Sequence, residues 1–246
     1  MLLPPSEGKA GNGNGPPYDP GSGTFGSLAA ARIAVRQALW HRDFDAAGQL
    51  GVQGVALVAA RATNGALERC PTMPALRRYT GVLYDALDYR GAPAALRRRL
   101  DAQLIIVSGL LGLVRGGDPV PDYKLPIGAR VPGLGRLGSF WKPHLAGALE
   151  PCTARRVVWD LLPVAHAAAA PVRRTRAHWR VRVLREQGGR RSTVSHDNKA
   201  VKGALARVLV AERIVHPKEL AGWRGPGGYR VDAVLPDGTV ELVSRG

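Results

Sequence analysis

The sequence is poor in cysteine, in acidic residues and in long apolar segments. Its two cysteines, Cys70 and Cys152, lie far apart and match no metal-ligand spacing such as C-x-x-C. We therefore expect free thiols in a reducing compartment. No apolar run reaches the roughly 18–20 residues that a membrane span requires, and the first five residues lack the features of a signal peptide. These absences predict a cytoplasmic protein with no membrane partner.

The scarcity of acidic residues leaves a strong positive charge. The chain has 35 Lys and Arg against 19 Asp and Glu, a formal net charge of +16. The excess is uneven, because residues 151–214 contain 14 basic and 4 acidic side chains. A one-sided field of this kind attracts polyanions and releases their counterions on contact, so nucleic acid is the natural partner. The alternative is a solvated basic surface that reflects composition alone.

The order of apolar segments predicts an α/β fold with a mixed β-sheet flanked by helices. Buried strands are expected at 103–108 and 156–161, and a half-exposed strand at 179–184. The expected helices are 94–101, 140–149 and 198–213, together with one that begins after Ser27 and turns Arg32 and Arg36 outward. Residues 109–128 read as a glycine-rich loop segment. No internal repeat or linker is visible, so one domain over 1–246 is expected.

The first candidate site is the segment from Ser6 to Lys9, which follows a very short apolar strand. Ligands bind at strand ends in open α/β sheets, glycine allows close approach of a phosphate, and lysine supplies a point charge. The spacing is not that of a phosphate-binding P-loop. The alternative is a polar turn with a surface lysine.

The second candidate site lies after another strand end, between Ser108 and Lys124. Arg115, Asp118, Tyr123 and Lys124 in this segment suit an anion site or the positioning of a proton donor. A structural Arg–Asp pair would explain part of the same pattern.

The third candidate site is the start of a basic helix. Ser195 or Asn198 is expected to cap it, which leaves free N–H groups facing an anion. Lys199 and Lys202 are three residues apart and so share one face. An ordinary capped surface helix is the alternative. His196 beside Ser195 is no catalytic triad, since triad members are assembled across a fold.

Two short predicted helices meet at residues 50–54, and the glycines between them resemble the turn of a helix-hairpin-helix. In that motif, backbone amides bind a phosphate without reading bases. Any tight turn between helices also favours glycine. The six histidines form no H-x-x-x-H pair, so neither a metal site nor a cofactor is expected.

Together, these segments resemble the YaaA family of peroxide stress proteins, in the order in which that family carries them. The matching pieces are Leu3-Pro4-Pro5-Ser6-Glu7-Gly8-Lys9, Tyr79-Thr80-Gly81-Val82-Leu83-Tyr84, the stretch 108–125, Phe140-Trp141, Ser195 to Gly203, and Gly228-Tyr229. The resemblance implies an α/β fold with a positively charged cleft and a helix-hairpin-helix-like element. It also implies a cytosolic role in limiting oxidative DNA damage, with binding to duplex DNA. The residues that would line the cleft are Ser6, Lys9, Arg115, Asp118, Tyr123, Lys124, Asn198, Lys199 and Lys202.

The sequence departs from the family pattern in two places. The opening apolar strand is short, and residues 160–166 carry apolar side chains and His166 where the family tends to have small polar residues and a tyrosine. A changed ligand or function is therefore also open: an enzyme acting on a small anionic or nucleotide-like metabolite. In that enzyme Lys9 or Lys124 would act as base or nucleophile, and Asp118 or Glu7 as proton carrier. An iron-handling or interaction protein is the weakest interpretation, because no ligand cluster is visible.

Overall fold

The computed structural model describes residues 1–193 and 195–245, without the side chains of residues 195–197. It contains a mixed eight-stranded sheet in the order β11-β12-β9-β8-β1-β3-β4, with β10 paired to β9. The pairs β2–β5 and β6–β7 form two small separate sheets. The predicted α/β fold class is therefore confirmed. The strands are β1 Leu2–Leu3, β2 Met73–Pro74, β3 Ile105–Ser108, β4 Gly112–Arg115, β5 Pro119–Val120, β6 Arg130–Val131, β7 Gly135–Arg136, β8 Val157–Asp160, β9 Ala177–Gln187, β10 Arg190–Ser192, β11 Arg230–Val234 and β12 Thr239–Arg245.

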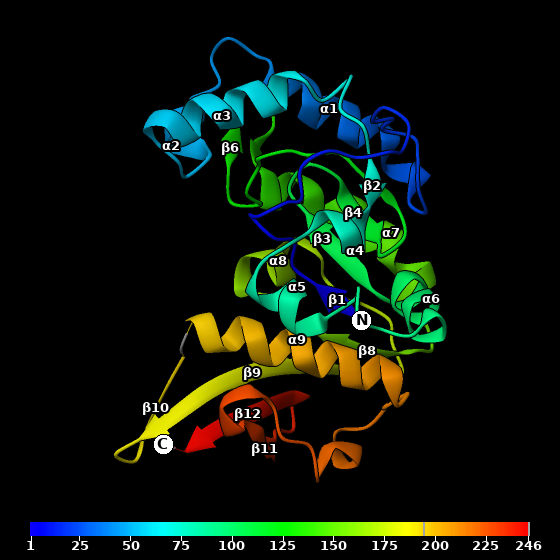
Figure 1. Ribbon diagram of the computed structural model, residues 1–246, viewed down its shortest axis with the longest axis vertical. Coiled ribbons are helices and arrows are strands. Elements are labelled where there is room, and N and C mark those ends of the chain that lie inside the picture. Colours follow the sequence, from blue (N-terminus) through cyan, green and yellow to red (C-terminus); the bar gives the residue numbers. More distant parts are fainter. Residues whose placement is uncertain (194, 246) are drawn as a thin grey trace.

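Helices cover this sheet, as Figure 1 shows. Helix α9 packs against α5, α6 and β9, and α7 packs against α8 and β4. Within the described residues, no helix combines the length and the apolar character needed to cross a bilayer. The helices are α1 Ala29–Leu39, α2 Ala46–Gln49, α3 Gly54–Gly65, α4 Ala75–Arg78, α5 Val82–Leu87, α6 Ala94–Gln103, α7 Leu137–Thr153, α8 Val164–Ala169 and α9 Ser195–Ala211, with 3-10 turns η1 Gly26–Leu28, η2 Pro217–Leu220 and η3 Pro226–Gly228.

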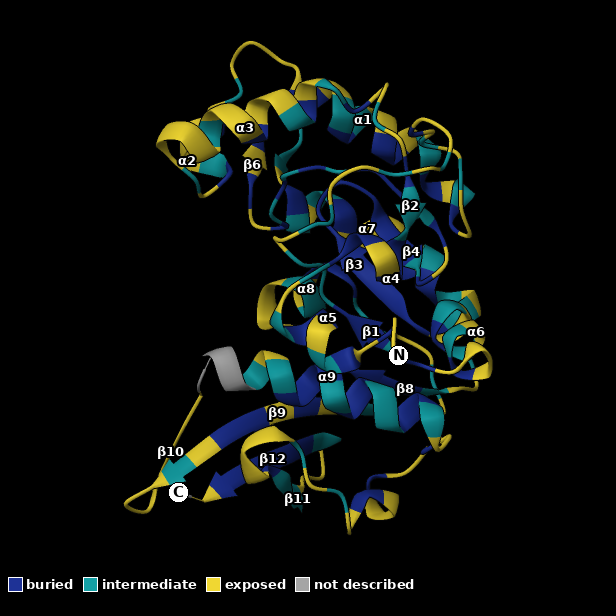
Figure 2. Cartoon of the chain, viewed as in Figure 1, coloured by how far each residue is buried: buried dark blue, intermediate teal, exposed yellow. Residues whose placement is uncertain are grey.

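The short strand β1 lies inside the sheet between two parallel neighbours. Leu2 pairs with Ile105 of β3 on one side and with Asp160 of β8 on the other. Both residues of β1 are buried, as are most residues of β3 and β8 (dark blue in Figure 2). The carboxyl ends of these three parallel strands therefore meet at one edge of the sheet, where ligands bind in open α/β folds. The segment 4–9 leaves β1 at that edge.

Helix α9 approaches α5 closely because Gly203 has no side chain. A Cβ atom at Gly203 would lie 2.0 Å from the Leu83 carbonyl oxygen and 2.9 Å from the Ala86 Cβ. This contact fixes the position of α9 relative to the start of α5. It therefore also fixes the side chains that α9 carries one turn before Gly203.

The structure corrects the prediction that Arg32 faces outward. Arg32 is 2% exposed, and its guanidinium donates hydrogen bonds to the carbonyl oxygens of Pro20, Ser22, Leu111 and Leu113 over 2.8–3.0 Å. The prediction from helical periodicity was wrong because it assigns charged residues to the solvent-facing side. It takes no account of buried carbonyl groups that need a hydrogen-bond donor.

Two other expectations change in detail. The segment 109–128 contains strand β4, which pairs antiparallel with β3, so it is not all loop. The proposed hairpin at residues 50–54 joins the single turn of α2 to α3, with Gly51 at φ 66° and Gly54 at φ 55°. Whether that turn binds DNA stays a prediction, as does the single-domain assignment.

Candidate functional site

A cavity of about 640 Å³ opens at the carboxyl end of β1. Its walls come from segment 4–9, the start of α5, segment 123–128, Leu161 and Pro163, α8 and the first turns of α9. These elements lie in the middle of the molecule in Figure 1. Seven of the predicted site residues line it, namely Ser6, Lys9, Tyr123, Lys124, Asn198, Lys199 and Lys202. The structure thus brings three distant candidate segments to one place.

Lys9 lies against an aromatic wall of the cavity. Its ammonium nitrogen is 4.1 Å from the Tyr123 ring centroid and 5.7 Å from that of Tyr79, and it donates to the Ser6 carbonyl oxygen at 3.1 Å. Burial lowers the pKa of Lys9 to about 8, against the opposing attraction of Asp122. Within the described residues Lys9 forms no ion pair, so its charge is available to a ligand.

The Tyr123 ring is held by a buried hydroxyl chain. Its hydroxyl lies 2.7 Å from the Ser108 Oγ and 2.9 Å from the Tyr79 hydroxyl. The Ser108 Oγ also accepts a hydrogen bond from the Leu111 backbone at 3.0 Å. Burial raises the pKa of Tyr123 to about 12, so the phenol stays protonated at neutral pH. Ser108 and Tyr123 therefore position Lys9 without being charged themselves.

Lys124 is placed by a residue that the sequence reading missed. Asn64, at the end of α3, accepts from the Lys124 backbone N–H and donates to the Lys124 carbonyl oxygen, both at 2.8 Å. The Lys124 ammonium lies 3.6 Å from a carboxylate oxygen of Glu7, whose side chain is 91% exposed. Because the Glu7 carboxylate is largely exposed, this pair contributes little energy, and Lys124 still offers its charge to the cavity. A buried asparagine gives no signal in the sequence.

Helix α9 contributes Asn198, Lys199 and Lys202. Lys202 is 7% exposed, and burial lowers its pKa to about 8, while Asp160 opposes the shift. Lys199 is exposed. Asn198 lies inside the first turn of α9 and so does not cap it; its buried Oδ1 has no hydrogen-bond partner among the described residues. Ser195 begins the helix, but its side chain lies outside the described residues.

His166 reaches the same cavity from α8. Burial lowers its pKa to about 4, so the imidazole is neutral at pH 7. Its buried Nδ1 has no hydrogen-bond partner among the described residues. The segment that departs from the family pattern therefore does line the cavity.

Arg115 and Asp118 do not line the cavity. The Asp118 carboxylate accepts from the backbone and hydroxyl of Thr24 at 3.0 and 2.8 Å and from the Arg115 backbone at 2.8 Å. The Arg115 guanidinium contacts the Ala102 carbonyl oxygen and lies 3.4 Å from the Cys152 sulfur. Asp118 thus connects the turn after β4 to Thr24, and Arg115 connects β4 to the ends of α6 and α7. Both side chains have structural contacts outside the cavity.

Among the described side chains, which leave out those of residues 195–197, no group of three or more His, Cys, Asp and Glu is arranged to hold a metal ion. Among the described residues that line the cavity, Glu7 is the one acidic side chain, against four lysines. The described part of the wall therefore carries a net positive charge.

Comparison with known proteins gives the same family over nearly the whole chain. The model of the family described as peroxide stress protein YaaA matches residues 1–235. A UPF0246 protein of Streptomyces coelicolor is 40% identical over 243 residues, covering 96% of this chain and 93% of the relative. A UPF0246 protein of Corynebacterium glutamicum is 37% identical over 226 residues, covering 89% and 88%. On the strength of this match, the chain belongs to the YaaA (UPF0246) family of peroxide stress proteins.

Proposed function

We propose that this protein binds double-stranded DNA during the peroxide stress response. The observation that carries the proposal is the convergence of Lys9, Lys124, Lys199 and Lys202 on one cavity, where Glu7 is the only acidic residue among the described lining residues. Lysines that neutralise backbone phosphates release counterions, and this term dominates binding that does not depend on sequence. The formal charge of +16 adds attraction at longer range.

Contact with the duplex falls to the lysines that solvent can reach. Lys199 is exposed, and the Lys124 side chain is 20% exposed. These two positions suit backbone phosphates, which fix orientation and do not read bases. The turn between α2 and α3 is a second proposed phosphate contact, through the backbone amides around Gly51. Because α2 and α3 lie far from α9 (Figure 1), the two contacts would touch separate stretches of one duplex.

The test is the binding of a labelled short duplex over a series of salt concentrations. The double variant Lys124→Ala/Lys199→Ala is compared with Lys142→Ala/Lys218→Ala, which removes the same charge at two exposed lysines outside the cavity. We expect the cavity variant to bind more weakly and to reduce the salt slope by about two, in keeping with two lost phosphate contacts. Absence of duplex binding at low salt, or equal losses in both variants, would overturn the proposal.

A second candidate function is chemistry on a small anionic molecule. It is favoured by the Lys9 ammonium, which forms no ion pair with a described residue, because a lysine with a pKa near 8 supplies free amine for base or nucleophilic catalysis. Of the other catalytic candidates, Lys124 also lines the cavity and Asp118 does not. Brief acylation at pH 7 followed by peptide mass spectrometry is expected to modify Lys9 ahead of the exposed Lys142. Slower labelling of Lys9 would argue against an activated amine.

A further inference from the structure

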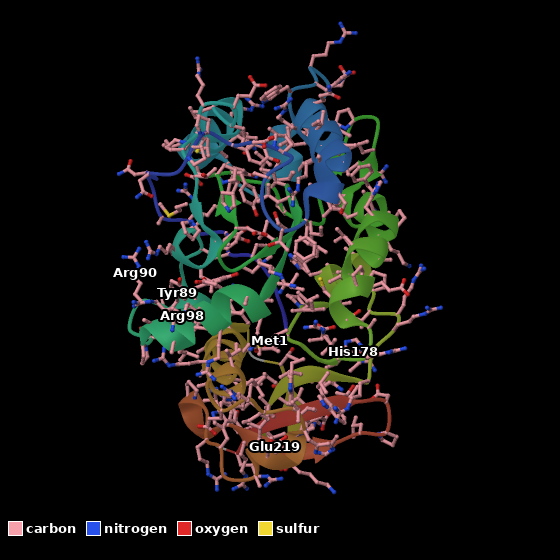
Figure 3. All side chains as sticks on the ribbon, turned by 90° about the vertical axis from the view of Figure 1, so that its right-hand side faces the viewer. Met1, Tyr89, Arg90, Arg98, His178 and Glu219 are labelled. Carbon is pink, nitrogen blue, oxygen red and sulfur yellow. The ribbon has the colours of Figure 1, made fainter. Side chains whose placement is uncertain are left out.

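A second basic surface lies at the amino ends of the parallel strands. Figure 3 looks onto this side of the molecule, with Met1 between Arg98 and His178. Strands β8 and β9 begin here, paired through Val157 and Ala177. We define the arginine edge as the five arginines that flank these strand starts and the ends of the neighbouring helices, namely Arg99, Arg155, Arg156, Arg176 and Arg213.

Arg156 and Arg176 are held next to each other by the backbone. The Arg176 N–H donates to the Arg156 carbonyl oxygen at 2.9 Å, and the Thr175 hydroxyl donates to the same oxygen. Both arginine side chains are exposed. Because adjacent strands lie only about 4.8 Å apart, the two arginines present their charges to solvent from neighbouring positions.

Arg99 and Arg213 line a separate hollow of about 380 Å³ at the same edge. The Arg99 guanidinium is anchored by a hydrogen bond of 3.2 Å to the Ala211 carbonyl oxygen at the end of α9. Val157 and Trp159 of β8 form another part of the wall, so the hollow adjoins the start of that strand. None of the described residues that line it is acidic.

Two arginines of the edge occupy backbone positions that normally favour glycine. Arg155 follows the end of α7 at φ 60°, and Arg213 follows the end of α9 at φ 59°. The left-handed region costs a residue with a side chain roughly 1–2 kcal/mol, and helix ends commonly use glycine there. Such strain is concentrated at functional positions. It therefore indicates a role for these two side chains beyond ending the helices.

The positive charge of the edge exceeds what the neighbouring helix ends need. Helices α6, α7 and α9 end here, and their three carboxyl ends carry about −1.5 charges together. Exposed Glu212 adds one negative charge, Glu150 is paired with Arg174 at 3.3 Å, and Asp101 and Arg98 lie three residues apart on α6 and offset each other. None of the five edge arginines forms an ion pair with a described residue. They therefore leave an excess of roughly two positive charges.

Arginines spread along an exposed edge suit a chain of phosphates. The guanidinium group is a planar fork of donors that matches a phosphate in a bidentate contact. Several such groups at separate positions match the repeated charges of a nucleic acid backbone better than the single charge of a small anion.

We propose that the arginine edge binds the phosphate backbone of a DNA duplex, as a second docking surface apart from the cavity. Val157 in the hollow and Leu161 in the cavity wall belong to opposite ends of β8, four residues or about 13 Å apart. The two openings therefore lie at opposite edges of the sheet. DNA is stiff over about 150 base pairs, so one short duplex does not reach both. The protein thus bridges two duplexes; the bridging rests on the proposed function, whereas the contact at the arginine edge does not.

The edge is tested in the Lys124→Ala/Lys199→Ala background, where the proposed cavity contact is weakened. Binding of a labelled short duplex is measured over a salt series after adding either Arg156→Gln/Arg213→Gln or the control Arg42→Gln/Arg69→Gln. The control removes the same charge at two exposed arginines that line neither the cavity nor the hollow. We expect the edge substitutions to weaken binding roughly tenfold at low salt and to reduce the salt slope by about two. Arg155→Gln/Arg176→Gln is a second edge variant should the first fail to fold.

Bridging is tested with a duplex fixed to beads and a second, labelled duplex in solution. Full-length wild type is expected to retain the labelled duplex on the beads. Arg156→Gln/Arg213→Gln with the cavity lysines intact should still bind the beads but retain much less label, and Arg42→Gln/Arg69→Gln should match the wild type.

Three results would overturn the proposal. One is equal duplex affinity of the edge and control variants in the cavity background. Another is unchanged retention of label by the edge variant, which would show that bridging arises from self-association. The third is displacement of the duplex by polyglutamate at equal charge concentration, which would identify an acidic protein segment as the partner. If the edge substitutions weaken binding but Lys124→Ala/Lys199→Ala alone does not, the arginine edge is supported and only the cavity contact fails.

Discussion

Lys9 is seated on the face of Tyr123, with 4.1 Å between the ammonium nitrogen and the ring centroid. The ring is itself fixed through its hydroxyl to Ser108 at the end of β3. The position of the lysine therefore depends on a strand that lies about a hundred residues later in the chain. A cation over an aromatic face gains roughly 0.5–2 kcal/mol and keeps its charge directed into the cavity.

Replacing Tyr123 by phenylalanine should separate the two roles of this residue. The ring that supports Lys9 remains, but the hydroxyl contacts to Ser108 and Tyr79 are lost. We expect the free energy of unfolding to fall by about 1–3 kcal/mol, because two buried hydroxyls lose a partner. Urea denaturation measures this change. Tyr123→Leu also removes the ring and should be less stable than the phenylalanine variant; if both are as stable as the wild type, the hydroxyl chain has no structural role.

Lys202→Met should stabilise the protein at neutral pH. The folded-state pKa of Lys202 is about 8, below its ordinary value of 10.5. At pH 7 the lysine is charged in both states, so folding bears the full cost of burying it, roughly 2–4 kcal/mol. Between pH 8 and 10.5 the unfolded state binds more protons than the folded state, so wild-type stability rises with pH through this window. Above pH 10.5 the lysine is neutral in both states, so the cost of burying its charge disappears.

The measurement is chemical denaturation of wild type and Lys202→Met from pH 7 to pH 10.5. The advantage of the variant should shrink steadily across this range. A constant difference between the two proteins would show that the ammonium is not desolvated. Lys142→Met, which alters an exposed lysine, should follow the wild type at every pH.

Gly203→Ala should disrupt the packing of α9 on α5. The new Cβ would lie 2.0 Å from the Leu83 carbonyl oxygen, so the two helices must move apart. We expect a loss of about 2–4 kcal/mol in the free energy of unfolding, since overpacking against backbone cannot be relieved by a rotamer change. Thermal and urea denaturation measure it.

Gly147→Ala is the matched control, because Gly147 lies within α7 with no atom within 4 Å of its added Cβ. Alanine should there stabilise the helix by about 0.5–1 kcal/mol. Similar destabilisation in both variants would mean that the Gly203 contact is not special.

Arg32→Met should cost several kcal/mol, because it leaves the carbonyl oxygens of Leu111 and Leu113 and of segment 20–22 without their donor. We expect a loss of roughly 3–5 kcal/mol. Arg42→Met is the comparison, since the Arg42 side chain is 91% exposed and pairs with the exposed Asp43. It should change stability by less than about 0.5 kcal/mol. If the two variants have equal stability, the four hydrogen bonds of Arg32 do not hold the segments together.

The strands and helices with strong apolar periodicity could be predicted from sequence. The run ending at Ser108 is β3, and the predicted helix over 94–101 is α6 at Ala94–Gln103. Strand β4 was missed because glycines at its start resemble a loop, and its pairing partner is the preceding strand. Arg32 was misplaced for a different reason: helical period assigns a face by polarity, whereas this side chain serves carbonyl groups distant in the sequence.

The part of the candidate site formed by lysines that follow strand ends could be predicted from the sequence. Lys9, Lys124 and Lys202 meet because parallel strands present their carboxyl ends at one edge, which follows from topology. Asp118 was grouped with Lys124 by its closeness in sequence, but a tight turn aims it at Thr24. The contribution of Asn64 depends on α3 packing beside segment 123–125, a contact between residues 60 positions apart.

The placement of β1 also has a consequence for synthesis. Leu2 and Leu3 are synthesised about a hundred residues before their strand neighbours Ile105 and Ile106, and longer before Asp160. The centre of the sheet can therefore form only after the residues up to Asp160 have been synthesised. The cavity can form only after α9 as well. Folding with such distant pairings is slow and leaves apolar segments exposed in the nascent chain. The cavity at the end of β1 is thus complete only after α9, the last element that lines it along the sequence, has been synthesised.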